Sequence, residues 1–228
     1  LETTYKYMLH YMFEGTEDPK RGEVYNNILR AVYELTDTAV DELLLLQSSN
    51  YFYERSRMDA LQTKKLNDFH NLLKDITASI QLYDLLENGD EKMTKTREAA
   101  TKRERLGTQM FDMVFISQQA NIEELSDYIE FINSDDIATR EKCLLISALM
   151  LNLIHRFDAV KTKVLLEATQ SDNSMVKARA FVGLILVLQL YNDRWHLYPE
   201  LQNRLDTFAE DIDFRKHILR VIIQLIRA

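Results

Sequence analysis

The strongest sequence evidence for the fold lies in the stretch Ser171–Tyr191, SDNSMVKARAFVGLILVLQLY. It opens with a short polar turn, continues through Val176 and Lys177, and then becomes almost entirely apolar. A polar turn of this kind can start a helix. The small residues Ala180 and Gly183 allow neighbouring helices to approach closely. A helix that is apolar on most of its surface must be covered on more than one side.

The same pattern recurs along the chain about every 37 residues. Four copies align, starting at Lys102, Thr139, Val176 and Phe214. The next residue is basic in each copy, which gives Arg103, Arg140, Lys177 and Arg215. Amphipathic segments lie between the apolar helices, at residues 122–133, 159–170 and 199–210. The repeating unit is therefore a pair of helices, and each pair must be covered by the next.

Composition supports a helical reading of the whole chain. Its 228 residues include only five Gly and two Pro, fewer turn residues than a sheet-rich fold needs. We therefore predict an all-α fold, built as an α-α superhelix, or solenoid, of antiparallel helix pairs. Two regions are expected: irregular, acidic and aromatic-rich helical hairpins over residues 1–90, and regular repeats over residues 91–228 that continue beyond this segment.

Four helical segments are expected in the first region. They cover residues 2–13, 24–35, 39–47 and 51–87, with breaks at residues 36–38 and 48–50 and a turn at residues 88–90.

The net charge and the cysteine count limit the expected binding partners and the expected cellular compartment. The net charge of −8 disfavours a general nucleic-acid binder. The single cysteine, Cys143, excludes a disulfide framework and fits a reducing compartment, so we expect a cytoplasmic protein. No apolar run reaches the length of a membrane span, and membrane association is not expected. Because the chain starts at Leu1 without a methionine, we expect it to be part of a longer protein.

The apolar helix of the repeat resembles a known family. Val176-Lys177-x-x-Ala180-x-x-Gly183-Leu184 is similar to the second helix of a HEAT repeat, and the turns Asp135-Asp136 and Asp172-Asn173 fit the same pattern. The resemblance is clearest over residues 122–191 and does not extend to residues 1–90. It implies a HEAT-like solenoid that serves as a protein-interaction scaffold. The tetratricopeptide pattern, with its shorter period, is not found.

Sequence motifs of catalysis and cofactor binding are absent. The chain has no phosphate-binding glycine loop, no H-E-x-x-H and no C-x-x-C, so no catalytic, cofactor or metal site is predicted. Cys143 could act as a nucleophile, but a buried cysteine in an apolar run is the better interpretation. His155, near a helix end, could act as a base, but a helix-terminal or loop histidine without a catalytic role is the better interpretation.

Two aromatic clusters are candidate protein contacts. Tyr51, Phe52 and Tyr53 are consecutive and cannot all face one core. Trp195, His196 and Tyr198 lie in a longer connection between helices, on an edge where solenoids often bind partners. For the first cluster the alternative is that a preceding or following domain covers it, or that it packs between helical hairpins. For Trp195 the alternative is packing over the end of the adjacent repeat.

The recurring basic residues Arg103, Arg140, Lys177 and Arg215 form what we call the basic ladder. Stacked repeats place these side chains in a row, which could bind an anionic partner. The preferred interpretation is structural, with each basic group paired to a carboxylate of a neighbouring repeat. On that basis Lys177→Met is expected to lower the melting temperature without altering partner binding.

The sequence therefore predicts a non-catalytic scaffold that binds protein partners and needs no cofactor. Two alternatives remain. The segment could be a helical accessory domain of an enzyme whose catalytic residues lie elsewhere. It could also bind nucleic acid through the basic residues between 91 and 105, which include Arg97, Lys102, Arg103 and Arg105.

Overall fold

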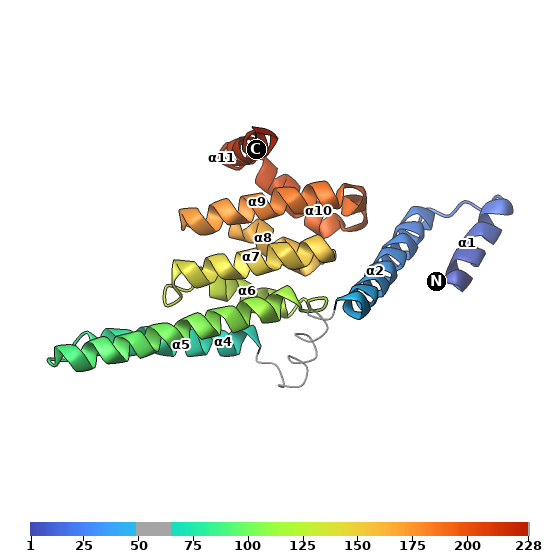
Figure 1. Cartoon of the computed structure of the whole chain (residues 1–228). Coiled ribbons are helices and arrows are strands. Elements are labelled where there is room, and N and C mark those ends of the chain that lie inside the picture. The colour runs from blue at the N-terminus through green and yellow to red at the C-terminus, as the bar shows by residue number, and fades with distance from the viewer. Residues whose placement is uncertain (49–64, 228) are drawn as a thin grey trace.

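The computed structural model describes residues 1–48 and 65–227, and every regular element in these two ranges is a helix (Figure 1). The predicted all-α class is confirmed. No helix in this part of the chain combines the length and the apolarity needed to cross a membrane. The helices are α1 (Glu2–Phe13), α2 (Arg21–Gln47), α4 (Leu66–Tyr83), α5 (Gly89–Phe115), α6 (Glu124–Asn133), α7 (Thr139–His155), α8 (Ala159–Ala168), α9 (Ser174–Leu190), the 3-10 helix η1 (Asn192–Leu197), α10 (Pro199–Ala209) and α11 (Ile212–Arg227).

From α4 onward the helices form two stacked layers. In one layer α5, α7, α9 and α11 pack successively against each other, and in the other α4, α6, α8 and α10 do the same. The stacking of α5, α7 and α9 is visible in Figure 1. The core lies between the layers and includes Phe131, Leu149 and Leu165, none of which is measurably exposed. Helix α11 packs against α9 and carries exposed apolar residues, among them Leu219 and Ile226.

The helix starts follow from capping residues in the sequence. The Asn88 side chain accepts hydrogen bonds from the Asp90 and Glu91 amides, so the expected turn at residues 88–90 is the N-cap of α5. Asn173 caps α9 in the same way by accepting from the Met175 and Val176 amides. The polar turn at the start of the stretch Ser171–Tyr191 is therefore a helix cap.

Helix α2 corrects one prediction, because it is continuous where a break was expected at residues 36–38. The Thr36 and Thr38 hydroxyls donate to the carbonyl oxygens of Val32 and Glu34, one turn back along the same helix, at 2.8 and 2.9 Å. These bonds satisfy the hydroxyls locally, so the threonines continue the helix instead of capping a new one.

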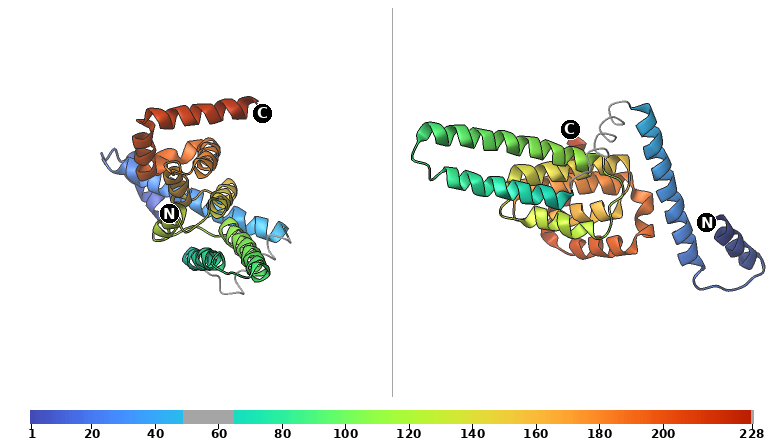
Figure 2. Two further views of the ribbon diagram at one scale, coloured as in Figure 1. Left: turned by 90° about the vertical axis from the view of Figure 1, so that its left-hand side faces the viewer. Right: turned by 90° about the horizontal axis from the view of Figure 1, so that it is seen from below.

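The boundary expected after residue 90 also needs correction. Residue 90 falls in the first turn of α5, and α4 packs against both α5 and α6. Figure 2 shows α4 and α5 running side by side along most of the length of α4. The stacked layers therefore begin at Leu66, within the region that was expected to be irregular. The segment predicted as helix over residues 51–87 is helical from Leu66 to Tyr83, and its first part lies outside the described residues.

Candidate functional site

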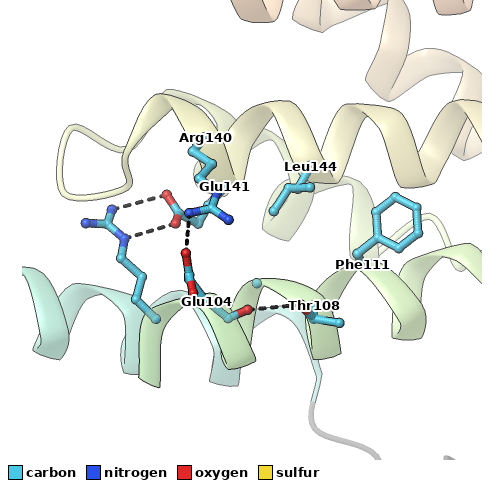
Figure 3. Close-up of a pocket in the computed structure, with 8 residues that line it drawn as sticks. Glu104, Thr108, Phe111, Arg140, Glu141 and Leu144 are labelled. Atoms are coloured by element: carbon cyan, nitrogen blue, oxygen red, sulfur yellow. Dashed lines mark hydrogen bonds and ion pairs between the residues drawn. The ribbon is translucent and has the colours of Figure 1, made fainter. Parts of the chain in front are cut away.

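Two members of the basic ladder form ion pairs across neighbouring repeats. Arg103 on α5 donates to both carboxylate oxygens of Glu141 on α7, at 2.9 and 3.1 Å. Arg140 on α7 donates back to Glu104 on α5 at 3.0 Å. The four side chains line a cavity of about 250 Å³ between the two helices, together with Gly107, Thr108, Phe111 and Leu144 (Figure 3).

The other two members of the ladder do not follow this arrangement. Lys177 is half-buried and Arg215 is exposed, and within the described residues neither forms an ion pair. The residue after each basic group explains the difference. It is Glu104 or Glu141 in the first two copies, but Ala178 in the third. The expectation that Lys177 is held by a neighbouring carboxylate is therefore wrong, and Lys177→Met should change stability by less than about 0.5 kcal/mol.

The two arginine–glutamate pairs differ in burial, which predicts different costs of breaking them. The Glu141 side chain is 3% exposed, whereas the Glu104 and Arg140 side chains are both at least 60% exposed. Arg103→Met leaves a buried carboxylate without its partner, and we expect it to lower the free energy of unfolding by about 2 kcal/mol. Arg140→Met should cost less than about 1 kcal/mol. Urea unfolding of the two variants tests this, and equal costs would contradict the assigned burial.

The ladder is poorly suited to binding anions. Two of its cations are neutralised by carboxylates at hydrogen-bond distance, and α5 interleaves its basic residues with Glu98 and Glu104. Of the residues considered for nucleic-acid binding, Arg97, Lys102 and Arg105 are exposed on α5, and Arg103 is paired with Glu141. That nucleic acid is not a partner stays a prediction.

The aromatic connection after α9 is a 3-10 helix, η1, rather than the loop that was expected. Trp195 is half-buried, donates from Nε1 to the Leu188 carbonyl oxygen at 3.1 Å, and packs edge-on against Phe157 with ring centroids 6.0 Å apart. The centroid of the Tyr198 ring lies 4.7 Å from the centroid of the same phenylalanine ring. Trp195 and Tyr198 thus pack within the molecule, and His196 is the exposed member of this predicted cluster.

The connection after α9 also holds helix α2 against the stacked layers. Arg194 in η1 makes a two-point ion pair with Asp37, with Nη2 3.0 Å from Oδ1, and its guanidinium lies 4.3 Å from the Tyr33 ring centroid. The Tyr198 hydroxyl donates to Glu34 at 3.5 Å. Burial raises the pKa of the Tyr198 hydroxyl above its ordinary value, so this donor keeps its proton. On the α2 side these contacts use the carboxylates of Glu34 and Asp37 and the ring of Tyr33.

A groove lies beside this contact, between α2, α8 and the start of α10. Its volume is about 680 Å³. Cationic Arg30 and Lys163 and anionic Glu23 and Glu200 all line it, and exposed Ile122 and His196 add apolar and aromatic surface. We call it the α2–α10 groove, and its lining is completed by Asn26, Asn27, Ala159, Val160, Leu197, Tyr198, Pro199 and Leu201.

A second groove adjoins the first along the same layer of helices. It also has a volume of about 680 Å³ and shares Lys163 and Glu200 with the α2–α10 groove. Its walls come from α6, α8 and α10, where Arg204 donates to both oxygens of Glu167 at 2.7 and 2.9 Å. The two grooves together give this layer a continuous furrow with charges of both signs.

The most buried polar cluster centres on Lys161 in α8, which is 1% exposed. Its ammonium donates to Ser117 Oγ at 2.8 Å, to the Gln118 carbonyl oxygen at 2.7 Å and to Asn152 Oδ1 at 2.8 Å. The Asp158 carboxylate lies 3.7 Å away. Burial lowers the pKa of Lys161 to about 8, and the charge of Asp158 opposes that shift.

Asp158 ties the same cluster to the backbone. One carboxylate oxygen accepts from the Val160 and Lys161 amides and so caps α8, while the other accepts from the Ala120 amide at 2.7 Å. Asn152 donates to the Phe115 and Ser117 carbonyl oxygens. The cluster therefore fixes the connection between α5 and α6 onto α7 and α8. Because all its polar groups have partners, we assign it a structural role.

Sequence reasoning missed this cluster. Lys161 lies in the segment 159–170, which was predicted only as an amphipathic helix, and nothing in the pattern of that segment shows that this lysine is buried. Asp158, just before that pattern, was a recognisable N-cap. Its second bond, to Ala120 one repeat earlier, depends on tertiary packing that the local sequence does not reveal.

The candidate nucleophile and base do not come together. Cys143 is 4% exposed, and burial raises the pKa of its thiol above the ordinary value, which disfavours the reactive thiolate. His155 is exposed at the other end of α7, about 18 Å further along the helix, with its ring against Phe115. In the part of the chain that the structure describes, no three His, Cys, Asp or Glu side chains gather into a possible metal site. Tyr51, Phe52 and Tyr53 lie outside the described residues.

Comparisons with known proteins do not assign the chain to a family. No family model matches it, and neither a curated protein nor a solved structure is detectably similar.

Proposed function

We propose that this chain is a helical-repeat scaffold, HEAT-like in its stacking, that binds another protein along the furrow formed by the α2–α10 groove and the adjoining groove. The supporting observation is that contacts recur between residues about one period apart. In one layer Tyr191 donates to the Leu153 carbonyl oxygen, 38 residues earlier, and in the other Arg204 pairs with Glu167, 37 residues earlier. Together with Arg103–Glu141 and Ala120–Asp158, these contacts are what successive repeats of an α-α superhelix would make.

The furrow suits an extended peptide segment of a partner. Stacked repeats expose long surfaces, and such surfaces are commonly used for protein recognition. Arg30 and Lys163 can bind acidic side chains, Glu23 and Glu200 basic ones, and Ile122 and His196 offer apolar and aromatic contact. A mixed lining of this kind favours a polypeptide over a polyanion, because a phosphate chain would meet the two carboxylates.

Site-specific photo-crosslinking tests this proposal. A photoreactive phenylalanine analogue is placed at His196, which lines the furrow, and at Glu98, an exposed control on α5. Expressed in the organism of origin, the protein labelled at His196 should capture one partner that the protein labelled at Glu98 does not. Lys163→Glu, with circular dichroism unchanged, should abolish the capture. If His196 captures no polypeptide beyond the control, the furrow is not the binding surface.

A further inference from the structure

Helix α2 contacts the rest of the molecule in an unusual way. It meets η1 and the end of α7 through its charged and hydroxyl-bearing face, which includes Tyr33, Glu34, Asp37 and Asp41. Its opposite face is apolar and open to solvent. Leu35 is 65% exposed, Leu43 is 55% exposed and Leu46 is 78% exposed. Amphipathic helices normally bury the apolar side, so this arrangement indicates that something else covers it.

The spacing on the open face is that of a helix-pairing seam. Apolar residues follow a 3-4 alternation along nearly the whole helix: Tyr25, Ile28, Val32, Leu35, Ala39 and Leu46, with Glu42 in the one polar position. This alternation is what two helices need in order to pack side by side along their length. The flanking positions include Leu29, Ala31, Thr36, Thr38 and Leu43, none of them charged. Two copies of α2 could therefore approach without repulsion between the flanks.

We propose that the open face of α2 is covered by the same face of a second copy of this chain, with the two helices antiparallel. Helix α1 lies beside the first part of α2, on the side away from the stacked layers (Figure 2), and it buries none of its own residues. With α1 in place the seam residues Tyr25 and Val32 are still 47% and 44% exposed. A specific interface must bury about 1,000 Å² in total, counting both partners. The large apolar side chains Leu35, Leu43 and Leu46, which are 65%, 55% and 78% exposed, supply much of the area that one copy would contribute. The stacked layers lie on the other side of α2 and do not obstruct this pairing (Figure 2).

The position of Glu42 decides the orientation. A parallel, in-register pair would set Glu42 against Glu42 of the second copy inside the seam, and facing like charges are unfavourable. An antiparallel pair centred beside Leu35 sets Tyr25 against Leu46 of the second copy and Ile28 against Leu43 of the second copy. Glu42 then faces Leu29 of the second copy at the edge of the seam, where water can reach the carboxylate.

The mass of the chain in solution tests the pairing. Light scattering at concentrations on the order of 100 μM should give twice the 26.8 kDa chain mass. Leu35→Glu should halve the measured mass with unchanged helical circular dichroism. Leu82→Glu on α4, where the leucine is similarly exposed at 64%, should leave the dimer intact. If the unmodified chain is a monomer, the proposal is overturned and a different partner must cover this face. A dimer that persists in Leu35→Glu also overturns the proposal, because the two copies then pair elsewhere.

Cysteine cross-linking tests the orientation. Residues 25 and 46 are about 30 Å apart within one helix, too far for a disulfide within a single chain. The Tyr25→Cys/Leu46→Cys double variant should therefore form covalent dimers on oxidation, and Leu46→Cys alone should not. Efficient cross-linking of Leu46→Cys alone would overturn the antiparallel arrangement. The unmodified chain, whose only cysteine is buried, gives the background.

Discussion

Lys161→Met is expected to lower the free energy of unfolding by about 3–5 kcal/mol and the melting temperature by on the order of 10 °C. Methionine is similar in length and apolar, but it donates no hydrogen bond. The variant leaves the Gln118 carbonyl oxygen and Asn152 Oδ1 without their donor in a dry environment. It also removes the cation 3.7 Å from Asp158. Thermal and urea unfolding, followed by circular dichroism, measure the loss.

Lys163→Met is the matched control, because it changes the same residue type two positions along α8. Lys163 is half-buried at the edge of the furrow, so its replacement should cost less than about 0.5 kcal/mol. If the two variants lose similar amounts of stability, Lys161 does not hold the α5–α6 connection in the way assigned here.

The pH dependence of stability gives a second measure of the same lysine. Its pKa of about 8 in the folded protein lies below the ordinary 10.5, so between these values the unfolded chain binds more protons. The folded protein favours the neutral amine of Lys161, so this lysine contributes most to the free energy of unfolding above pH 10.5. That contribution is lost as the pH falls through 8. The stability of the wild type relative to Lys161→Met should therefore rise by about 2 kcal/mol between pH 7 and pH 9.5. A flat difference would show that the pKa of Lys161 is not lowered.

Gly183→Leu is the second large effect that we expect, a loss of about 3 kcal/mol or more. A Cβ atom on Gly183 would lie 3.3 Å from Cβ and Cγ of Met150 on α7 and 3.3 Å from Leu165 Cδ1 on α8. A Cβ atom is fixed to its backbone and cannot move aside, so a larger side chain must push α9 away from α7 and α8. Chemical denaturation of the variant measures the cost.

Alanine substitutions at the two buried helix glycines sharpen this test. Alanine gains up to about 1 kcal/mol of helix propensity over glycine. At Gly107 the added Cβ meets only the flexible end of Leu144, beside the cavity of Figure 3, so Gly107→Ala should be neutral or stabilising. At Gly183 the contact with Met150 should offset the gain and make Gly183→Ala destabilising. Equal effects at the two positions would mean that the packing of α9 on α7 is looser than described.

The apolar helices of the repeat were predictable from the sequence because their pattern is local. The core positions Cys143 and Ala180 share one register, and both are buried in the structure. The helix starts at Asn88 and Asn173 likewise depend on side chains that bond to nearby amides. The HEAT-like superhelix itself stays a proposal.

The site was less predictable, because its contacts connect residues that are distant in sequence. The prediction that each residue of the basic ladder pairs with a carboxylate was wrong for Lys177 and Arg215. Such pairing also depends on the residue that follows each basic residue, which is a glutamate only in the first two copies. Arg194 and Asp37 are 157 residues apart in the sequence, and the 37-residue periodicity of the chain does not predict their contact. Trp195 and Tyr198 were candidate contact residues and instead pack on Phe157, which leaves His196 as the exposed member of that predicted cluster.

The spacing of equivalent positions along the stack distinguishes an open array of helix pairs from a closed helical bundle. Spin labels at Thr101 on α5, Met175 on α9 and Asp213 on α11 occupy the same exposed position in three repeats. The Leu35→Glu background removes distances between copies. With neighbouring helices about 10 Å apart, the Thr101–Met175 distance should be about 20 Å and the Thr101–Asp213 distance about 30 Å. A Thr101–Asp213 distance no longer than Thr101–Met175 would mean a closed bundle and would contradict the scaffold described here.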